Sequence, residues 1–160
     1  MKRGYVHWYA ARVRYQTEKT IKKFLEAQGI EHYIPMQDEK PLIPCLIFIR
    51  TDHEKALSLP IVSGYMISYL YDPSTKQFRI VPDKQMEYLM IIQQYIDRML
   101  VLPHPEKLFG GKKVRVTDGE FAGIEGELYR IQGHKRVVVR LNGLISVATS
   151  YVPKEYLEEI

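Results

Sequence analysis

The alternation of hydrophobic and polar residues predicts a compact group of strands in the last third of the chain. Val114-Arg115-Val116 opens an alternating run that stops at the turn residues Asp118-Gly119. A second run follows Gly126, and a third follows Gly133-His134 and ends near residue 141. A period of two indicates half-buried strands, and glycine allows the positive φ that chain reversals need. This region is therefore predicted to form a short, curved antiparallel sheet.

The first hundred residues instead predict strands interleaved with helices. The expected elements are a strand over 6–14, a helix between Thr17 and Gly29, strands over 30–36 and 42–50, a short helix over 53–59, a hairpin of 65–71 with 77–81, and a long helix from Asp83 to about Leu100. Thr17, Asp52 and Asp83 are suitable N-cap residues, and Gly29 suits the position after a helix end. Pro44 cannot donate to a strand ladder and so indicates a sheet edge or a bulge. An antiparallel sheet covered by helices is expected.

A proline-rich stretch separates the two patterns. Pro103 and Pro105 stop the long helix and predict a short, stiff connection. The fold class is therefore α+β, with an N-terminal antiparallel sheet flanked by helices over 1–102, a linker over 103–109 and a strand-rich domain over 110–160. The length of 160 residues fits two small domains.

The glycine spacing of the C-terminal region resembles a KOW motif. From Val114 to Gly126 the chain is V-R-V-x-D-G-x-F-A-G-x-x-G, with Gly119, Phe121 and Gly123 at the turn positions. KOW motifs occur in NusG-type transcription elongation factors and in some ribosomal proteins. The resemblance implies a small SH3-like β-barrel for this domain.

The front half is similar to the N-terminal domain of the NusG family. Trp8-Tyr9, Glu18, Ile34-Pro35, Pro41-Leu42-Ile43-Pro44 and Phe48 stand in the order seen in that family. Three features depart from its usual pattern, namely Cys45 in place of glycine, Leu46 in place of tyrosine and a very short loop over 36–41. These departures resemble the specialised RfaH- and UpxY-type paralogues.

The resemblance implies a binding site for RNA polymerase. In NusG-like proteins a hydrophobic concavity on the N-terminal sheet grips the clamp helices of the polymerase. The matching positions here are Arg12, Leu42, Ile43, Pro44, Leu46 and Phe48. Exposed apolar surface of this kind marks partner sites, although all the apolar positions are also candidates for the core. Alternation puts Leu46 and Phe48 on one face and Cys45, Ile47 and Ile49 on the other, and leaves open which face the helices cover.

The charge distribution indicates a second site. The formal net charge is +4, but residues 1–23 carry seven basic side chains and one acidic one, a net +6 that leaves −2 for the other 137 residues. Arg14, Tyr15, Lys19, Lys22 and Lys23 cluster on one strand end and one helix face. By resemblance to RfaH-like proteins, this region lies beside the non-template DNA strand in the transcription bubble. Basic side chains bind phosphate and Tyr15 suits stacking on an unpaired base, while a solvated helix face is an equally ordinary interpretation.

A third site is implied for the KOW domain. In this family it recruits a second protein, a ribosomal protein or the termination factor Rho, through the loop between its last strands. Asn142, Gly143, Leu144 and Ile145 occupy that place. A hairpin that buries Ile145 is the alternative. Refolding of this region into helices is disfavoured, because its many valines favour strands.

The sequence offers little for catalysis, metals or membranes. Cys45 is the only cysteine and is expected to be a buried, inert thiol. The five histidines are scattered, and no glycine-rich phosphate-binding motif precedes a helix. The longest apolar run is far too short to span a membrane. We therefore expect a cytoplasmic, monomeric protein that is not an enzyme and needs no cofactor or metal.

The function expected from these observations is that of a transcription elongation factor. It would bind RNA polymerase and promote processive elongation or antitermination, in the operon-specific manner of capsular polysaccharide regulators. A general housekeeping NusG factor is one alternative. The other is a ribosome-associated RNA-binding protein that uses basic residues of the KOW domain, namely Arg115, Arg130, Lys135, Arg136 and Arg140.

Overall fold

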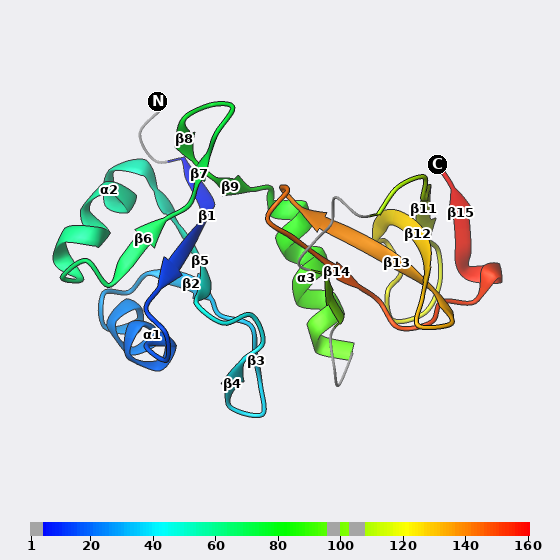
Figure 1. Ribbon diagram of the computed structural model, residues 1–160, viewed down its shortest axis with the longest axis horizontal. Helices are drawn as coiled ribbons and strands as arrows, with labels where there is room; N and C mark the ends of the chain where they lie inside the picture. Colours follow the sequence, from blue (N-terminus) through cyan, green and yellow to red (C-terminus); the bar gives the residue numbers. More distant parts are fainter. Residues whose placement is uncertain (1–4, 96–99, 103–107) are drawn as a thin grey trace. The chain divides into compact units, whose positions relative to one another are not determined.

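The computed structural model describes residues 5–95, 100–102 and 108–160, which divide into two compact units, Met1–Asp83 and Lys84–Ile160 (Figure 1). This division differs from the predicted boundaries at 102 and 109. The helix α3 (Asp83–Tyr95) and the strand β10 (Leu100–Leu102) group with the strands that follow them, because β10 is hydrogen-bonded into the second unit's sheet. Most of the predicted linker, residues 103–107, lies outside the described residues.

The N-terminal unit is built on an antiparallel sheet with two helices. The strand order is β2-β5-β1-β6, and β9 also pairs with β1. These strands are β1 (Val6–Val13), β2 (Glu31–Tyr33), β5 (Leu46–Asp52), β6 (Ile67–Tyr69) and β9 (Ile80–Val81). The helices are α1 (Glu18–Ala27) and α2 (His53–Val62), which lie on the same side of the sheet in Figure 1.

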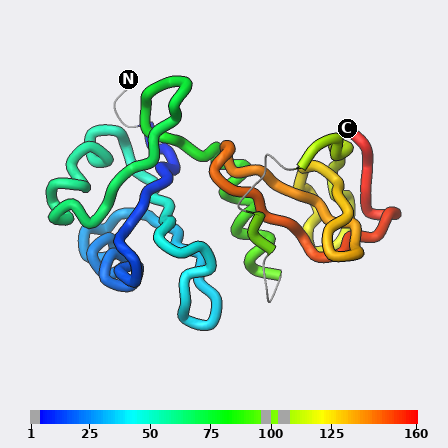
Figure 2. The backbone as a smooth tube through the Cα atoms, in the orientation of Figure 1, coloured from blue at the N-terminus to red at the C-terminus, as the bar shows by residue number. Residues whose placement is uncertain are grey.

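Two short hairpins complete this unit. One pairs β3 (Met36–Gln37) with β4 (Lys40–Pro41), and the other pairs β7 (Tyr71–Asp72) with β8 (Gln77–Phe78). The first loops away from the sheet as the cyan segment of the backbone trace (Figure 2). The second was predicted as part of a longer hairpin, and the structure shortens both of its strands.

The ends of the two helices follow the sequence only in part. Gly29, with φ +68, ends α1 as predicted, and the Ile30 N–H donates to the Leu25 carbonyl over 2.9 Å. Asp52 caps α2 as predicted, because its carboxylate accepts from the Lys55 N–H over 2.7 Å. Thr17 does not cap α1 with its side chain, since its hydroxyl donates backward to the Arg14 carbonyl over 2.6 Å.

Two predicted boundaries around prolines are wrong. The helix expected to end before Pro60 continues to Val62, because Pro60 lies in its last turns and costs a single backbone donor. The strand expected from Leu42 begins only at Leu46, because residues 42–45 form a turn in which the Leu46 N–H reaches the Ile43 carbonyl over 3.3 Å. Pro44 thus sits in a turn before the strand and not at a bulge within it.

The C-terminal unit is a six-stranded antiparallel sheet of order β10-β14-β13-β12-β11-β15. Its remaining strands are β11 (Lys112–Val116), β12 (Glu125–Ile131), β13 (His134–Leu141), β14 (Ile145–Ala148) and β15 (Leu157–Glu159), with a 3-10 turn at Lys154–Tyr156. The strands predicted from alternation are all present. Leu100 was predicted near the end of a helix, but it begins β10 and pairs with Ala148.

Two glycines of the predicted turn have different physical roles. Gly123 adopts φ +94 with open space around it, so backbone freedom alone accounts for glycine there. At Gly126 a Cβ would lie 2.4 Å from the carbonyl oxygen of Val138 on the neighbouring strand. Gly126 therefore permits β12 and β13 to approach each other closely.

Candidate functional site

The register of the N-terminal sheet resolves which side chains share a face. Tyr9 pairs with Ile49, whereas Ala10 pairs with Phe48 and Arg12 with Leu46. Cross-strand partners in an antiparallel pair project to the same side of the sheet. The sheet therefore has one face that carries Tyr9 and Ile49 and an opposite face that carries Ala10 and Phe48.

The helices of this unit cover the Tyr9 side. Residues from β1, β5 and β6 form one buried cluster with Ile21 and Leu25 of α1 and with Ala56 and Leu59 of α2. Ile47 and Ile49 belong to this cluster and are fully buried. Alternation grouped Ile47 and Ile49 correctly, and the structure answers the question of which face the helices take.

The opposite face holds several of the predicted polymerase-binding residues. We call it the Trp8 face, and it carries Trp8, Ala10, Arg12, Leu46, Phe48 and Val81. Its apolar side chains are buried, with Phe48 0% and Leu46 6% exposed. The open groove expected at Leu46 and Phe48 is therefore not found at these two positions. Arg12, at the end of the face, is exposed.

Sequence reasoning did not include Trp8 or Val81 among the polymerase-binding residues. Alternation along β1 groups Trp8 with Ala10 and Arg12, as the register shows, and Val81 pairs with Trp8 through a strand of two residues. Tyr33 also belongs here, because it pairs with Phe48, and burial raises the pKa of Tyr33 to about 12. The predicted strand over 77–81 contains β9, but no local pattern indicated that β9 would pair with β1.

The turn before β5 is held by a buried carboxylate. Glu18 is 3% exposed, and its Oε2 accepts from the Cys45 N–H over 2.9 Å. Cys45 adopts φ +67, a left-handed conformation that disfavours side chains. The bond links the first turn of α1 to the segment with Leu42, Ile43 and Pro44, of which Pro44 is exposed and the other two are half-buried. Cys45 is half-buried rather than fully enclosed as expected.

The predicted basic cluster is fully available to solvent. All five of its members are exposed, Tyr15 at 73%. Tyr15 and Arg14 lie in the turn between β1 and α1, and the three lysines lie on the outer face of α1, opposite the buried Ile21 and Leu25. The cluster is thus a cationic surface with one protruding aromatic ring.

The loop of residues 142–145, which is predicted to bind a second protein, is partly buried. Ile145 belongs to β14 and is 9% exposed, so the hairpin that buries Ile145 is observed. Leu144 is half-buried, and the Asn142 N–H donates to the Gln85 side chain of α3 over 2.8 Å. Phe121 of the glycine turn is also buried and meets the ring of Tyr95 edge-on, with centroids 6.4 Å apart.

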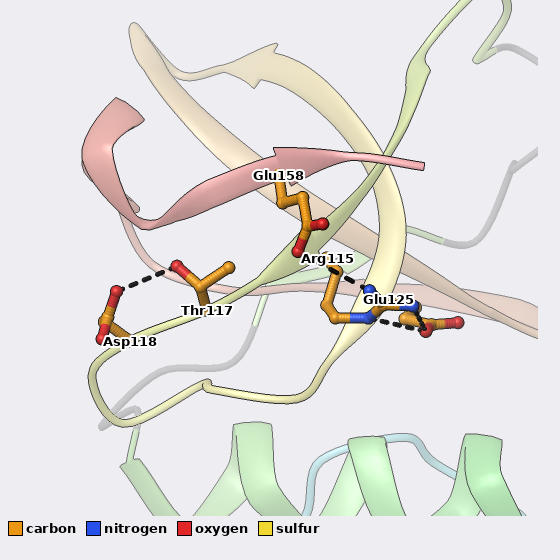
Figure 3. Close-up of polar contacts among 5 residues, drawn as sticks. All are labelled: Arg115, Thr117, Asp118, Glu125 and Glu158. Carbon is orange, nitrogen blue, oxygen red and sulfur yellow. Dashed lines mark hydrogen bonds and ion pairs between the residues drawn. The ribbon is translucent and has the colours of Figure 1, made fainter.

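An ion-pair network ties three strands of the C-terminal sheet together (Figure 3). Arg115 on β11 contacts Glu125 on β12 at 2.8 Å and Glu158 on β15 at 3.6 Å. The hydrogen bond from Arg115 to Glu125 and the charge of that carboxylate raise the pKa of Arg115. A second pair joins Arg140 to Glu127, and Arg136 donates to the carbonyls of Ile131 and Thr149. These arginines are structural cross-links of the sheet.

Other kinds of site have little support in the part of the chain that the structure describes. Among the described residues no three or more His, Cys, Asp or Glu side chains come together as metal ligands do. Nor does any described helix have the length and apolar character required to cross a bilayer.

Comparison with known proteins agrees with this organisation. The family model described as "Transcription termination factor nusG" matches residues 6–90, more than half of the chain. The structure of NusG from Thermotoga maritima, described for its domain interaction, superposes with a TM-score of 0.53 at 19% identity over 98% of both chains, a likeness of fold. Conformation A of the MjSpt4:Spt5 complex aligns over 96% of this chain and 97% of that one at 16% identity, with a TM-score of 0.33. No curated protein matches the chain.

Proposed function

Because the chain belongs to the NusG family of transcription factors, we propose that it is a non-enzymatic elongation factor that binds RNA polymerase in the cytoplasm. It would promote processive elongation or antitermination by steadying the closed clamp. The observation that carries the proposal is the register of β1 and β5, which groups Arg12, Leu46 and Phe48 on a face separate from the helix-covered core.

The polymerase-binding surface is proposed at the accessible margin of the Trp8 face. Arg12 and Pro44 are exposed there, and Leu42 and Ile43 are half-buried next to them. An apolar segment beside a cationic side chain suits a helical partner that presents both apolar and acidic residues. Leu46 and Phe48 would support this margin from beneath, since both are buried.

The non-template DNA strand is proposed to run along the basic cluster. Lysine and arginine side chains that face phosphate release counterions on binding, so the affinity falls as the salt concentration rises. Tyr15 is placed among them as an exposed ring, and stacking on a ring tolerates any base. Each lysine that contacts phosphate is expected to add about one unit to the salt slope.

The C-terminal unit is proposed to be a KOW domain that recruits a second protein through residues 142–145. Gly119 and Gly123 have the positive φ that the motif's turn requires. The partner would be a ribosomal protein or Rho, as in related factors. Operon specificity of the capsular polysaccharide type is proposed from Cys45, Leu46 and the short loop over 36–41.

The alternative of a ribosome-associated RNA-binding protein is less well supported. It required Arg115, Arg136 and Arg140 to face RNA, but all three are occupied by carboxylates or carbonyls of their own unit. Of the five, only Arg130 and Lys135 are exposed, and Arg130 also donates to the Gly133 carbonyl over 3.0 Å. The charge of the N-terminal unit is concentrated on one surface, which favours nucleic-acid contact there.

The proposal is tested with the full-length protein, purified RNA polymerase and an elongation assay on a leader-containing template. Arg12→Glu, at an exposed position, is expected to weaken retention on polymerase about tenfold or more while the melting temperature stays unchanged. Arg130→Glu is the matched control, because it makes the same charge change on an exposed residue of the other unit.

Replacement of Lys19, Lys22 and Lys23 by glutamine separates the DNA contact from the polymerase contact. The triple variant should keep polymerase binding through Arg12 but lose part of the salt-dependent affinity for a single-stranded oligonucleotide. The proposal fails if the wild-type protein does not bind polymerase, or if Arg12→Glu and Arg130→Glu bind it equally well.

A further inference from the structure

A pocket of the N-terminal unit lies between α2 and the β7–β8 hairpin. It is not part of the polymerase-binding, DNA-binding or KOW-domain surfaces proposed above. It has a volume of about 370 Å³. Its walls include Tyr9, His53, Tyr71 and Phe78, with Leu57 and Lys76 also lining it. Pockets of this size accommodate small ligands or single side groups of a polymer.

Phe78 is the centre of an aromatic cluster at this pocket. Its ring stacks on Tyr69 with centroids 4.6 Å apart, and it meets Tyr71 edge-on at 5.2 Å. His53 and Tyr9 lie about as near, at 6.0 and 6.1 Å. The cluster joins rings from a helix and several strands, so the aromatic wall is held in place from several sides.

The mouth of the pocket combines exposed apolar and polar groups. Tyr71 is 60% and Leu57 51% exposed, so both present apolar surface to solvent at the rim of the pocket. Lys76 and Gln77 are exposed residues of the lining. Lys76 is fixed at φ +57, and its N–H donates to the Asp72 carbonyl over 2.8 Å, so the backbone that carries this ammonium group is rigidly placed.

The interior also has unused hydrogen-bonding capacity. Within the described residues, the hydroxyls of Tyr9 and Tyr69 are buried and have no hydrogen-bond partner. Burial is the main cause that raises the pKa of both groups, so both remain neutral donors and acceptors at ordinary pH. A purely apolar core gains nothing from two such hydroxyls, since buried polar groups are normally paired.

We propose that this pocket binds a nucleobase together with its adjacent phosphate. A planar heterocycle would stack in the aromatic wall of Tyr71 and Phe78, and the Gln77 amide and the His53 ring would reach its polar edge. The Lys76 ammonium group would contact the phosphate. A cationic ligand is disfavoured by Lys76, and a purely apolar one by the polar groups at the rim.

Two sources supply this chemistry, a free mononucleotide and an unpaired nucleotide within a strand. The second deepens the proposed function, on which it rests, because a factor bound beside the transcription bubble meets single-stranded nucleic acid. The pocket would then add a stacking site to the phosphate contacts of the basic cluster. The first would make the protein responsive to a soluble nucleotide.

The test titrates the full-length protein with the four ribonucleoside monophosphates and with mixed-sequence DNA and RNA pentanucleotides. Binding is followed by NMR of the aromatic side chains at low salt. We expect Tyr71 and Phe78 resonances to shift on binding, and Tyr71→Ala to weaken the affinity of the bound probe about tenfold. Tyr65→Ala is the matched control, since Tyr65 is 70% exposed and does not line the pocket.

Lys76→Gln tests the phosphate contact separately, because a residue with only a structural role would not change the salt dependence of binding. It should lower the salt dependence of binding by about one unit and leave the melting temperature unchanged. Tight binding of monophosphates identifies a soluble nucleotide as the ligand, whereas binding of pentanucleotides alone identifies a strand.

The inference is overturned if neither probe class shifts the Tyr71 and Phe78 resonances, or if Tyr71→Ala binds as tightly as Tyr65→Ala. Polymerase retention is measured in parallel on the same variants. Retention without nucleotide binding refutes the pocket alone, and nucleotide binding without retention refutes the proposed elongation function alone.

Discussion

The two units of the molecule differ in which residue types adopt the left-handed backbone conformation. Among the described residues, six of the eight positions with positive φ in the N-terminal unit are not glycine, whereas five of the seven in the C-terminal unit are glycine. A side chain in this conformation costs about 1–2 kcal/mol, which glycine avoids. The C-terminal unit therefore reverses its chain with little strain, whereas the strained reversals of the N-terminal unit depend on other stabilising contacts.

Three reversals of the N-terminal unit show such bonds. Cys45 donates to the buried Glu18 carboxylate over 2.9 Å. The Tyr65 N–H reaches the Pro60 carbonyl at 2.7 Å, and the Lys76 N–H reaches the Asp72 carbonyl at 2.8 Å. Two of the three lie at surfaces proposed here to bind partners, which is where strained backbone tends to collect.

The largest effect on stability is expected in the C-terminal unit, at a glycine whose neighbours leave no room for a side chain. Gly126→Ala places a Cβ 2.4 Å from the Val138 carbonyl oxygen, and backbone cannot move aside as a flexible side chain does. The free energy of unfolding of this unit should fall by about 3 kcal/mol, measured by denaturant titration.

Gly123→Ala is the matched control for that substitution. Gly123 has open space but φ +94, so only the conformational cost of about 1–2 kcal/mol applies. Equal losses for the two variants would show that positive φ, and not the close approach of β12 and β13, determines the need for glycine.

The second effect concerns the bond that holds Cys45. Glu18→Ala removes the acceptor and leaves a part-buried N–H without its partner, so the free energy of unfolding should fall by about 2 kcal/mol. Glu18→Gln keeps an oxygen of the same reach and should lose clearly less. Both losses are measured by urea titration, and an equal loss in the two variants would mean that the charge itself stabilises the turn.

The success of prediction from the sequence also differs between the two units. Glycine spacing and alternating valines predicted the strands of the C-terminal unit, because there the local backbone preference and the final conformation agree. The caps at Asp52 and Gly29 were predicted for the same reason. The left-handed turn at Cys45 was not, since nothing local marks a cysteine for φ +67 and the carboxylate that holds it lies 27 residues away.

Tertiary contacts account for the other differences. Alternation correctly separated Leu46 and Phe48 from Ile47 and Ile49, but it carried no information on burial, and both faces of β5 are buried. The placement of α3 with the C-terminal unit depends on contacts such as that between Gln85 and Asn142, which are distant in sequence. The aromatic pocket depends on the same kind of long-range packing around Phe78.

A third, smaller effect should have the opposite sign. Cys45→Gly removes the strain of a side chain at φ +67 but adds freedom to the unfolded chain, and the two terms leave a gain of about 0.5 kcal/mol in the free energy of unfolding. Cys45→Ala keeps a Cβ and should show no gain. Thermal unfolding of the two variants side by side measures the strain. A gain in stability in both variants would show that the thiol, and not the backbone conformation, is the source of the destabilisation.

The smallest effect is a local dependence on pH at the reversal that carries Lys76. The Asp72 carboxylate accepts from the Ser74 hydroxyl at 2.6 Å and from the Ser74 N–H at 2.9 Å, and these bonds hold the pKa of Asp72 below its usual value of 3.8. A carboxyl group with a lowered pKa in the folded state stabilises the fold above its unfolded pKa and loses that contribution as the pH falls through the folded value. The hairpin should therefore loosen below about pH 4 while the rest of the unit stays folded.

Amide NMR shifts of Ser74 and Lys76 between pH 6 and pH 2 measure this loosening. Asp72→Asn keeps an acceptor oxygen but does not titrate, so its turn should show no such transition. If the wild-type turn is also unchanged down to pH 2, the Asp72 side chain does not hold Lys76 in its left-handed conformation. The backbone bond from the Lys76 N–H to the Asp72 carbonyl must then be sufficient, and the ammonium group at the mouth of the aromatic pocket would keep its position at every pH at which the unit is folded.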